Sequence, residues 1–295
     1  MEPEAQILSQ SALNGVSIGI SVSQSPDLAR LGLTEAHFRL TLGEVARSML
    51  VLGGGIAYGG HLEPGGYTVF LLSELKRYGR KDRPFRICLP WSEHRRVPLS
   101  RLADLSKDLG LYARVDCLDP EGNPVDPAFG RTELPAAETD LTVVARSLTA
   151  MRTYMGNVTQ GRVLIGGRRL GFQGVLPGLM EEALIAFEKG WPVYLAGGFG
   201  GVTLDIIRAL NEENAAWLPE SRDSPPPDSR WSAGIASLKK LSSDPKWEGI
   251  KNGLSALENR RLAATHRPSD VAALVSMGLG RLAAERRLKS GDGVS

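Results

Sequence analysis

The sequence predicts an α/β protein with a Rossmann-like fold: a doubly wound, mostly parallel sheet with helices on both faces, plus a C-terminal helical extension. Short apolar segments alternate with helix-patterned stretches over about 200 residues, which is the pattern of such sheets. These segments are rich in Val, Ile and Leu with little alternation, as is typical of strands covered on both faces. In this architecture ligands bind beyond the carboxyl ends of the strands.

The expected strands are six apolar segments, several of which run into glycine, as in "RVLIGG" and "PVYLAGG". The segment "ARVDCL" has the weakest pattern. In chain order the segments cover residues 15–22, 48–55, 85–90, 113–118, 162–167 and 192–198.

Helical spacing of apolar residues fills the intervals between these strands. Thr34 precedes "EAHF" and Thr139-Asp140 precede "LTVV", and Thr and Asp are common residues at helix N-termini. In chain order the expected helices cover residues 34–49, 66–79, 99–109, 139–157, 177–189 and 201–210.

The composition changes after residue 217. The stretch "LPESRDSPPPDSRW" (218–231) is rich in Pro, Ser and Asp and indicates a loop or linker. Helical patterns follow at 231–241, 247–264 and 269–289. We therefore expect a Rossmannoid domain over 1–217 and a linker with a helical extension over 218–295. The extension either packs on the sheet, which we favour, or forms a partner surface.

Composition and charge exclude several classes of function. The chain has 295 residues, of which 42% are apolar, so it can bury a sizeable core. Its 35 basic and 33 acidic residues nearly cancel, which argues against a broad nucleic-acid surface. The N-terminus "MEPEAQILSQ" lacks the features of a secretory signal, and no apolar run approaches membrane-spanning length. We expect a cytoplasmic protein without membrane or nucleic-acid partners.

The cysteines and histidines do not have metal-ligand spacing. Cys88 and Cys117 each lie inside a short apolar run, which favours two buried, reduced thiols; a disulfide is the alternative. The histidines are scattered along the chain. We expect no metal and no cofactor besides a nucleotide-type ligand.

Three glycine- or serine-rich clusters follow expected strands. They are "SVSQSPD", "GGGIAYGGHLEPGGYT" and "GGRRLGFQGVLPGLMEEAL". Glycine lets the backbone approach a ligand closely, and amides at a following helix N-terminus favour an anion. The clusters therefore predict a phosphate-bearing ligand; the alternative is a set of tight structural turns. Neither a Walker A loop nor a dinucleotide fingerprint is present, which disfavours hydride transfer.

The order "ISVSQSPD", "LVLGGGIAYGG", "MRTYM", "RVLIGGR" and "PGLMEEAL" resembles the SLOG superfamily over about residues 14–212. That superfamily includes LONELY GUY-type phosphoribohydrolases and nucleotide-sensing domains found beside bacterial immunity effectors. The nearest resemblance is to a subgroup with a "GGR…GFQG…PG…EEA" pattern, present here at 166–168, 171–174, 177–178 and 181–183.

The resemblance implies roles for two residues if the protein is an enzyme. In the phosphoribohydrolases an arginine of an "RKxxM" helix and a glutamate after "PGGxGT" cleave the N-glycosidic bond of a nucleoside 5′-monophosphate. Arg152 and Glu182 occupy those positions here. Thr153 replaces the lysine, however, and Leu179 stands where the family has a phosphate-contacting threonine. These departures weaken the expectation of catalysis more than that of a pocket.

Helix geometry bears on the two adjacent glutamates. Neighbouring helix residues point about 100° apart, so Glu181 and Glu182 are not expected to face one pocket together. We expect one glutamate, preferably Glu182, to reach the ligand and the other to be solvated. A carboxylate near the ribose would stabilise oxocarbenium character or activate water, and an arginine would hold phosphate.

These considerations define the candidate site. The predicted catalytic pair is Arg152 and Glu182. The predicted ligand-binding residues are Ser21, Ser23, Gly53, Gly54, Gly55, Gly59, Gly60, Arg152, Gly166, Gly167, Arg168, Gly171, Phe172, Gln173, Gly174, Gly178, Glu181 and Glu182.

The preferred function is recognition of a nucleotide or ADP-ribose-like signal. The second hypothesis is a phosphoribohydrolase-like enzyme that cleaves nucleoside 5′-monophosphates. The third is a scaffold whose helical tail docks an effector protein while the pocket is vestigial. The resemblance also suggests homodimers and a role in bacterial nucleotide signalling or defence.

Overall fold

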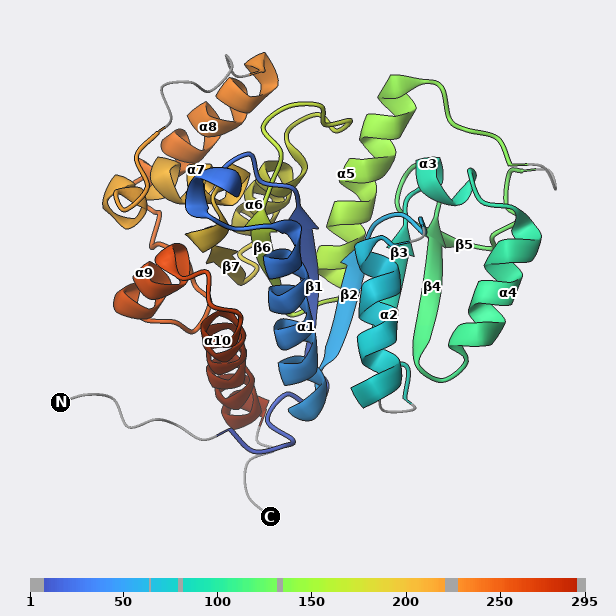
Figure 1. Ribbon diagram of the computed structural model, residues 1–295, viewed down its shortest axis with the longest axis horizontal. Helices are drawn as coiled ribbons and strands as arrows, with labels where there is room; N and C mark the ends of the chain where they lie inside the picture. Colours follow the sequence, from blue (N-terminus) through green and yellow to red (C-terminus); the bar gives the residue numbers. More distant parts are fainter. Residues whose placement is uncertain (1–7, 64, 79–81, 132–134, 221–227, 291–295) are drawn as a thin grey trace.

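A computed structural model describes residues 8–63, 65–78, 82–131, 135–220 and 228–290. These residues form a seven-stranded sheet in the order β5-β4-β3-β2-β1-β6-β7, flanked by helices on both faces (Figure 1). Neighbouring strands are parallel except for β5, which runs antiparallel to β4. The predicted Rossmann-like α/β fold is confirmed.

The strand order reverses at β1. From β1 the chain builds outward through β2, β3, β4 and the short β5, and then returns to place β6 and β7 on the other side of β1. The boundary between β1 and β6 is therefore the topological switch point, where open α/β sheets bind ligands. The strands are β1 Ser17–Ser23, β2 Gly55–Gly59, β3 Phe85–Leu89, β4 Ala113–Leu118, β5 Pro124–Val125, β6 Gly161–Gly166 and β7 Val193–Ala196.

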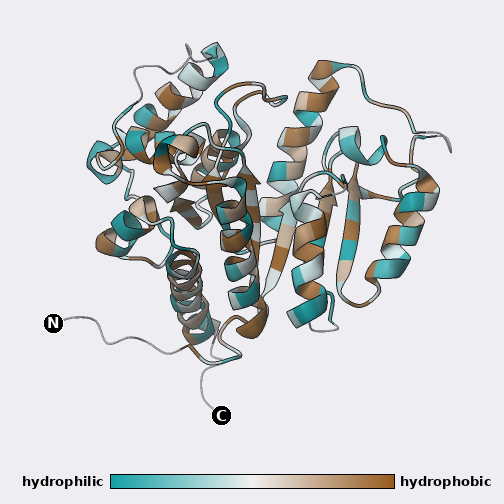
Figure 2. Ribbon diagram, viewed as in Figure 1, coloured by the Kyte–Doolittle hydropathy of each residue, from teal (hydrophilic) through white to brown (hydrophobic). Residues whose placement is uncertain are grey.

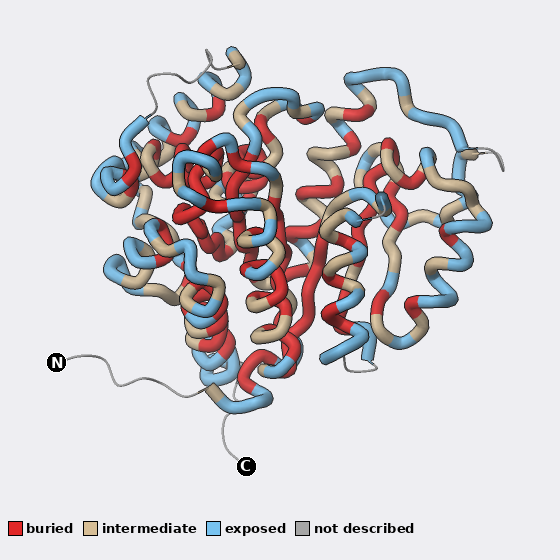
Figure 3. Tube along the Cα trace, viewed as in Figure 1, coloured by how far each residue is buried: buried red, intermediate tan, exposed pale blue. Residues whose placement is uncertain are grey.

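Alternate strand residues pack against different helices. On one face, Ile18, Ile20 and Val163 join a core with α1 (Glu35–Val51), α2 (Tyr67–Tyr78), α4 (Leu99–Leu109) and α10 (Pro268–Ser290). On the other face, Leu164 packs with α6 (Gly178–Glu188), α7 (Gly201–Leu210) and α8 (Ser229–Ser242), and Ala57 packs with α5 (Leu141–Asn157). Figures 2 and 3 show that the central strands between these two layers are largely apolar and buried, whereas β4 is more polar and more exposed.

Shorter elements complete the described part of the chain. The structure contains α3 (Trp91–His94), α9 (Ala256–Ala264) and the 3-10 turns η1 (Ala29–Leu31), η2 (Gly197–Phe199) and η3 (Glu212–Ala215).

The helix starts follow the caps expected from the sequence. Asp140 accepts hydrogen bonds from the backbone N–H groups of Thr142 and Val143, at 2.8 and 3.4 Å, and so satisfies two free donors of the first turn of α5. The expected caps at Thr34 and Asp140 both directly precede their helices.

The expected strand over 48–55 is wrong. Residues 48–51 form the last turn of α1, and β2 begins only at Gly55. The run "SMLVLGGG" is short and apolar, so periodicity alone does not distinguish a buried helix end from a strand. Met49 and Leu50 are in fact buried on the inner face of α1. Gly53 and Gly54 thus connect α1 to β2, and Gly55 is the first residue of the strand.

The expected helix over 247–264 is too long. Within this range only α9 is helical, and Ser255 is its N-cap. The Ser255 hydroxyl accepts a hydrogen bond from the backbone N–H of Glu258. The Glu258 carboxylate in turn accepts one from the backbone N–H of Ser255. This reciprocal capping box fixes the helix start.

The C-terminal helices pack on the sheet, as preferred from the sequence. Val271, Val275 and Leu279 of α10 lie in the same core as α1, while α8 packs against α7. Residues 221–227 of the expected linker and residues 291–295 lie outside the described residues. None of the helices in the described ranges combines the length and apolar character needed to cross a membrane. Cys88 and Cys117 are buried free thiols, as predicted.

Candidate functional site

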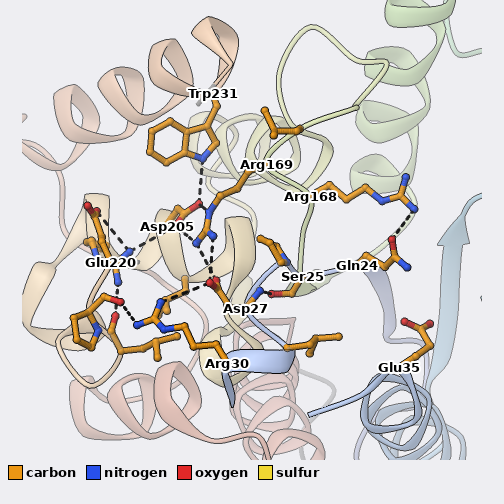
Figure 4. A pocket seen from close by; sticks show the side chains of 17 residues that line it. Gln24, Ser25, Asp27, Arg30, Glu35, Arg168, Arg169, Asp205, Glu220 and Trp231 are labelled. Carbon is orange, nitrogen blue, oxygen red and sulfur yellow. Dashed lines mark hydrogen bonds and ion pairs between the residues drawn. The ribbon is translucent and has the colours of Figure 1, made fainter. Parts of the chain in front are cut away.

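A cavity of about 730 Å³ opens at the carboxyl edge of the sheet, at the switch point between β1 and β6. Its walls come from the segment after β1, the β6–α6 loop (residues 167–177), α7, the segment 218–220 and the start of α8. Figure 4 shows the polar side chains that line it. The position is the one predicted by strand order for a ligand in this architecture.

An ionic bridge holds the cavity wall together. The guanidinium of Arg169 donates to both carboxylate oxygens of Asp205, each at 2.8 Å, and to Oδ2 of Asp27 at 2.9 Å. Burial alone would lower the pKa of Arg169, but the hydrogen bonds and charges of Asp205 and Asp27 raise it above its usual value. Asp27 also accepts the backbone N–H of Gly201 at 2.7 Å, at the N-terminus of α7. The three charged side chains thus tie three walls of the cavity to one another.

Arg168 differs from the other arginines of the cavity. Arg30 lies 3.8 Å from Asp27, and Arg208 lies 3.6 Å from Asp205 and 3.8 Å from Glu220. Arg168 is exposed and donates to the side-chain oxygen of Gln24 at 3.2 Å. Within the described ranges no carboxylate forms an ion pair with it. Its charge is therefore available to an anion in the cavity.

Glycines allow the β6–α6 loop to meet α7. Gly167 has φ 111°, and a Cβ there would lie 2.8 Å from Cβ of Val202; Gly201 has φ 65°, and a Cβ there would lie 2.6 Å from the Gly167 carbonyl oxygen. Gly166 has φ 72°, and a Cβ there would lie 2.6 Å from the Ser23 carbonyl oxygen and 2.7 Å from the Phe38 ring. The backbone N–H of Arg168 donates to Oγ of Ser23 at 3.2 Å. The predicted residues Ser23, Gly166, Gly167 and Arg168 therefore lie together.

A buried ion cluster lies on the α5–α6 side of the same sheet edge. Nη1 of Arg152, on α5, is 2.5 Å from Oε2 of Glu181, and its Nε is 3.7 Å from Oε1 of Glu182. Nη1 of Arg162, on β6, is 3.2 Å from Oε2 of Glu182. Ser21 donates to Glu182, and Thr149 donates to Glu181. Two positive and two negative side chains thus neutralise one another inside the protein.

The expectation that one glutamate is solvated is wrong. Glu181 and Glu182 are 6% and 7% exposed, and both interact with Arg152. The two side chains do diverge from α6, but both sides of the helix N-terminus are covered: Thr149 of α5 binds one glutamate, and Ser21 of β1 binds the other. The Arg152 side chain reaches both carboxylates, because its Nη1 faces Glu181 and its Nε faces Glu182.

The rest of the predicted loop has mixed surroundings. Gly174 and Gly178 lie against Arg152, where an added Cβ would be 2.9 Å from Nη1 and Nη2 respectively. The ring of Phe172 stacks under the guanidinium of Arg230, on α8, at 4.1 Å. Gly171 and Gln173 are exposed.

The second glycine cluster is split between opposite edges of the sheet. Gly53 and Gly54 precede β2 and Gly55 is its first residue, so all three lie at the amino end of the strand, which starts later than expected. An added Cβ would meet Asn14 at Gly53, Met49 at Gly54 and Ser17 at Gly55. This placement corrects the prediction that they lie beside the other glycines at the carboxyl edge.

Gly59 and Gly60 do lie at the carboxyl end of β2. A Cβ at Gly59 would be 2.6 Å from the sulfurs of Met151 and Met155 of α5, so this glycine permits close packing of the helix.

Several important residues were not among the candidates. Asp27 belongs to the quoted "SQSPD", and a charged residue at the start of the buried segment "RVLIGG" was a signal for Arg162. Asp205 and Trp231 gave no local signal. Neither Arg152 nor the two glutamates line the cavity. The described residues contain no cluster of three His, Cys, Asp or Glu side chains arranged to hold a metal.

Comparison with known proteins places the chain in a family. A search of curated proteins finds no match. A protein-family model described as SLOG cluster2 matches residues 12–262, which is most of the chain. This match confirms the predicted resemblance to the SLOG superfamily and suggests a nucleotide-related Rossmannoid protein. With its doubly wound sheet and its cavity at the switch point, the chain belongs to the SLOG cluster2 family.

Proposed function

We propose that this protein binds a nucleotide or an ADP-ribose-like ligand in the switch-point cavity and acts as a sensor of it. The observation that carries the proposal is Arg168, an exposed guanidinium in the cavity wall whose hydrogen-bond partner is the neutral Gln24. A guanidinium presents paired N–H donors that suit phosphate oxygens. Anion binding therefore fits this wall of the cavity.

The cavity supports the proposal by its size and composition. Its volume of about 730 Å³ falls within the usual range for small-molecule sites, roughly 300–1,000 Å³. Apolar side chains such as Leu170, Leu204 and Leu218 share the wall with charged and polar side chains. Membership of a SLOG family favours a nucleotide-type ligand over other anions.

Recognition is favoured over hydrolysis because the buried carboxylates are already engaged. A glycosidase needs a carboxylate that reaches the anomeric carbon or its water. Here Glu182 binds Ser21 and faces two arginines, Glu181 binds Thr149 and Arg152, and neither lines the cavity. Access to substrate would require this network to open.

A phosphoribohydrolase is the second candidate, and one observation favours it. The arginine and glutamate identified by resemblance, Arg152 and Glu182, do come together, with Nε and Oε1 3.7 Å apart. A hydrolase would release free base from AMP, and Glu182→Gln would abolish that release.

The test of the sensor is ligand-dependent thermal stabilisation with recovery of intact ligand. AMP and ADP-ribose are titrated separately against the full chain, and the ligand is analysed afterwards by mass spectrometry. Free ligand at about 100 times Kd should add about 2.7 kcal/mol of stability.

Arg168→Ala should raise the Kd about tenfold or more. Arg77→Ala is the matched control, because Arg77 is an exposed arginine on α2 outside the cavity. Equal affinity of the Arg168 and Arg77 variants, or no stabilisation of the unsubstituted protein by either ligand, would contradict the proposal.

A further inference from the structure

The indole of Trp231 forms part of the cavity wall in a fixed orientation. Trp231 belongs to the first turn of α8, and its Nε1–H donates to Oδ2 of Asp205 at 3.1 Å (Figure 4). Asp205 is only 4% exposed, and Arg169 binds both of its oxygens. The Asp205 carboxylate, itself held by Arg169, thus fixes the N–H edge of the indole. The orientation of the indole is therefore set before any ligand binds.

The surroundings of the indole suit a flat aromatic group. The apolar side chains of Leu170, Leu204 and Leu218 line the same cavity. Trp231 is half-buried and packs in part against the apolar cluster of α6 and α7. The hydrogen bond uses the ring edge, so it does not occupy the π-surface that borders the cavity. Stacking of a nucleobase on an aromatic side chain contributes to binding with every base, because each base has a π-face.

We infer that Trp231 is the base-stacking wall of the site. The ligand would place its base against the indole and its phosphate toward Arg168, which comes from a different segment and stands apart from the indole in Figure 4. The inference rests on the proposed function. It makes the aromatic base a part of the ligand that the site recognises directly and excludes bare phosphosugars as equal ligands.

The experiment compares ligands with and without a base. Calorimetric titrations measure the Kd of AMP, ADP-ribose and ribose 5-phosphate for the full chain and for Trp231→Leu, Trp231→Phe and Trp217→Leu. Trp217 is the matched control because it is partly exposed and does not line the cavity.

Trp231→Leu should raise the Kd of the two base-containing ligands at least about tenfold, equivalent to about 1.4 kcal/mol. It should leave the Kd of ribose 5-phosphate within about twofold, since that ligand has nothing to stack. Trp231→Phe should fall between the unsubstituted protein and Trp231→Leu, and Trp217→Leu should bind as the unsubstituted protein does.

Fluorescence gives a second readout if Trp231→Leu does not fold. AMP or ADP-ribose should quench part of the indole emission of the unsubstituted protein and of Trp217→Phe, and this quenching should be lost in Trp231→Phe. Quenching that persists in Trp231→Phe would overturn the stacking role.

The failures are distinguishable. If base-containing ligands bind Trp231→Leu normally while Arg168→Ala weakens them, the stacking role is wrong and the proposed function stands. If neither AMP nor ADP-ribose binds the unsubstituted protein, the proposed function and the inference both fail.

Discussion

At the scale of single residues, the ion cluster buries the charges of Arg152, Arg162, Glu181 and Glu182 inside the protein. Arg162 is 2% exposed, and burial lowers the pKa of its guanidinium, opposed by the charge of Glu182. Its Nη2 also donates to the Arg152 carbonyl oxygen at 2.8 Å. Charges buried in this way are tolerated only with good partners, so loss of one partner is costly.

Arg162→Met should therefore destabilise the protein strongly. It leaves Glu182 without its nearest cation and should lower the free energy of unfolding by about 3–5 kcal/mol in urea denaturation. The matched control is Arg114→Met, also on a strand, where an exposed arginine pairs with Asp116 at 3.3 Å. Asp116 keeps its pair with Arg86 at 2.8 Å, so loss of the exposed Arg114 should cost at most about 1 kcal/mol. Similar losses in both variants would contradict the account of the cluster.

His94 makes stability depend on pH. Burial lowers the pKa of its imidazole to about 4, partly offset by the Leu118 carbonyl, and nearby Arg131 and Arg95 lower it further. The unfolded chain has the ordinary value of 6.5, so it binds a proton between these values and the folded protein does not. The contribution of His94 to the free energy of unfolding should be constant well above pH 6.5. It should fall by up to about 3 kcal/mol as the pH is lowered toward 4.

The check is chemical denaturation of the unsubstituted protein and of His94→Gln between pH 4 and pH 7. His94→Gln cannot titrate, so its unfolding free energy should decline less on acidification. His266→Gln is the control because His266 is exposed. An acid-dependent loss identical in the His94 and His266 variants would show that other groups cause it.

At the level of elements, the glycines of the β6–α6 loop and of α7 determine how closely the cavity walls approach. Gly201 and Gly171 both have a positive φ of nearly the same size, 65° and 68°. They differ in surroundings: a Cβ at Gly201 would meet the Gly167 carbonyl oxygen at 2.6 Å, whereas a Cβ at Gly171 would meet open space. Comparing alanine substitutions at these two glycines therefore separates the cost of a steric clash from the cost of the positive φ.

Gly171→Ala should cost only the left-handed backbone penalty, about 1–2 kcal/mol. Gly201→Ala should cost clearly more, and it should also weaken ligand binding because it moves α7 and Asp27 away from the loop. Denaturation and ligand titration of both variants measure these effects. Equal stability and equal affinity would mean that the close approach of the two walls is unimportant.

Most elements could be predicted from the sequence, and the exceptions have physical causes. Periodic helices with caps, such as α5 behind Asp140, carry local information. The start of β2 could not be predicted in this way, because the apolar run before Gly55 fits the end of a helix as well as it fits a strand.

The candidate site also has parts that could be predicted from the sequence and parts that could not. Arg152 and Glu182 could be paired by resemblance, and they meet in the structure. The burial of Glu181 depends on Thr149 of another helix, and the role of Trp231 depends on a contact with Asp205, 26 residues away in sequence. Contacts of this kind leave no periodic pattern in the chain.

At the scale of the whole molecule, the C-terminal helix is part of the main core. Val275 and Leu279 of α10 are fully or almost fully buried beside α1, in the cluster that also contains strand residues such as Ile18 and Tyr194. Loss of this contact should thus affect global stability.

Leu279→Ala should lower the free energy of unfolding by about 2–5 kcal/mol, because it leaves a cavity in the core. Leu288→Ala, on the same helix at a position 76% exposed, should change it by no more than about 0.5 kcal/mol. Thermal or urea unfolding measures both variants. A Leu279→Ala protein as stable as Leu288→Ala would mean that α10 docks only loosely.

The central claim is that an anion and an attached base occupy the switch-point cavity. A crystal structure of the full chain soaked with ADP-ribose tests it most directly. We predict a phosphate within hydrogen-bonding distance of Arg168 and the adenine over the indole of Trp231, with the ion pairs of Arg152 to Glu181 and Glu182 intact. Ligand bound instead between Arg152 and Glu182, with the cavity vacant, would contradict the account.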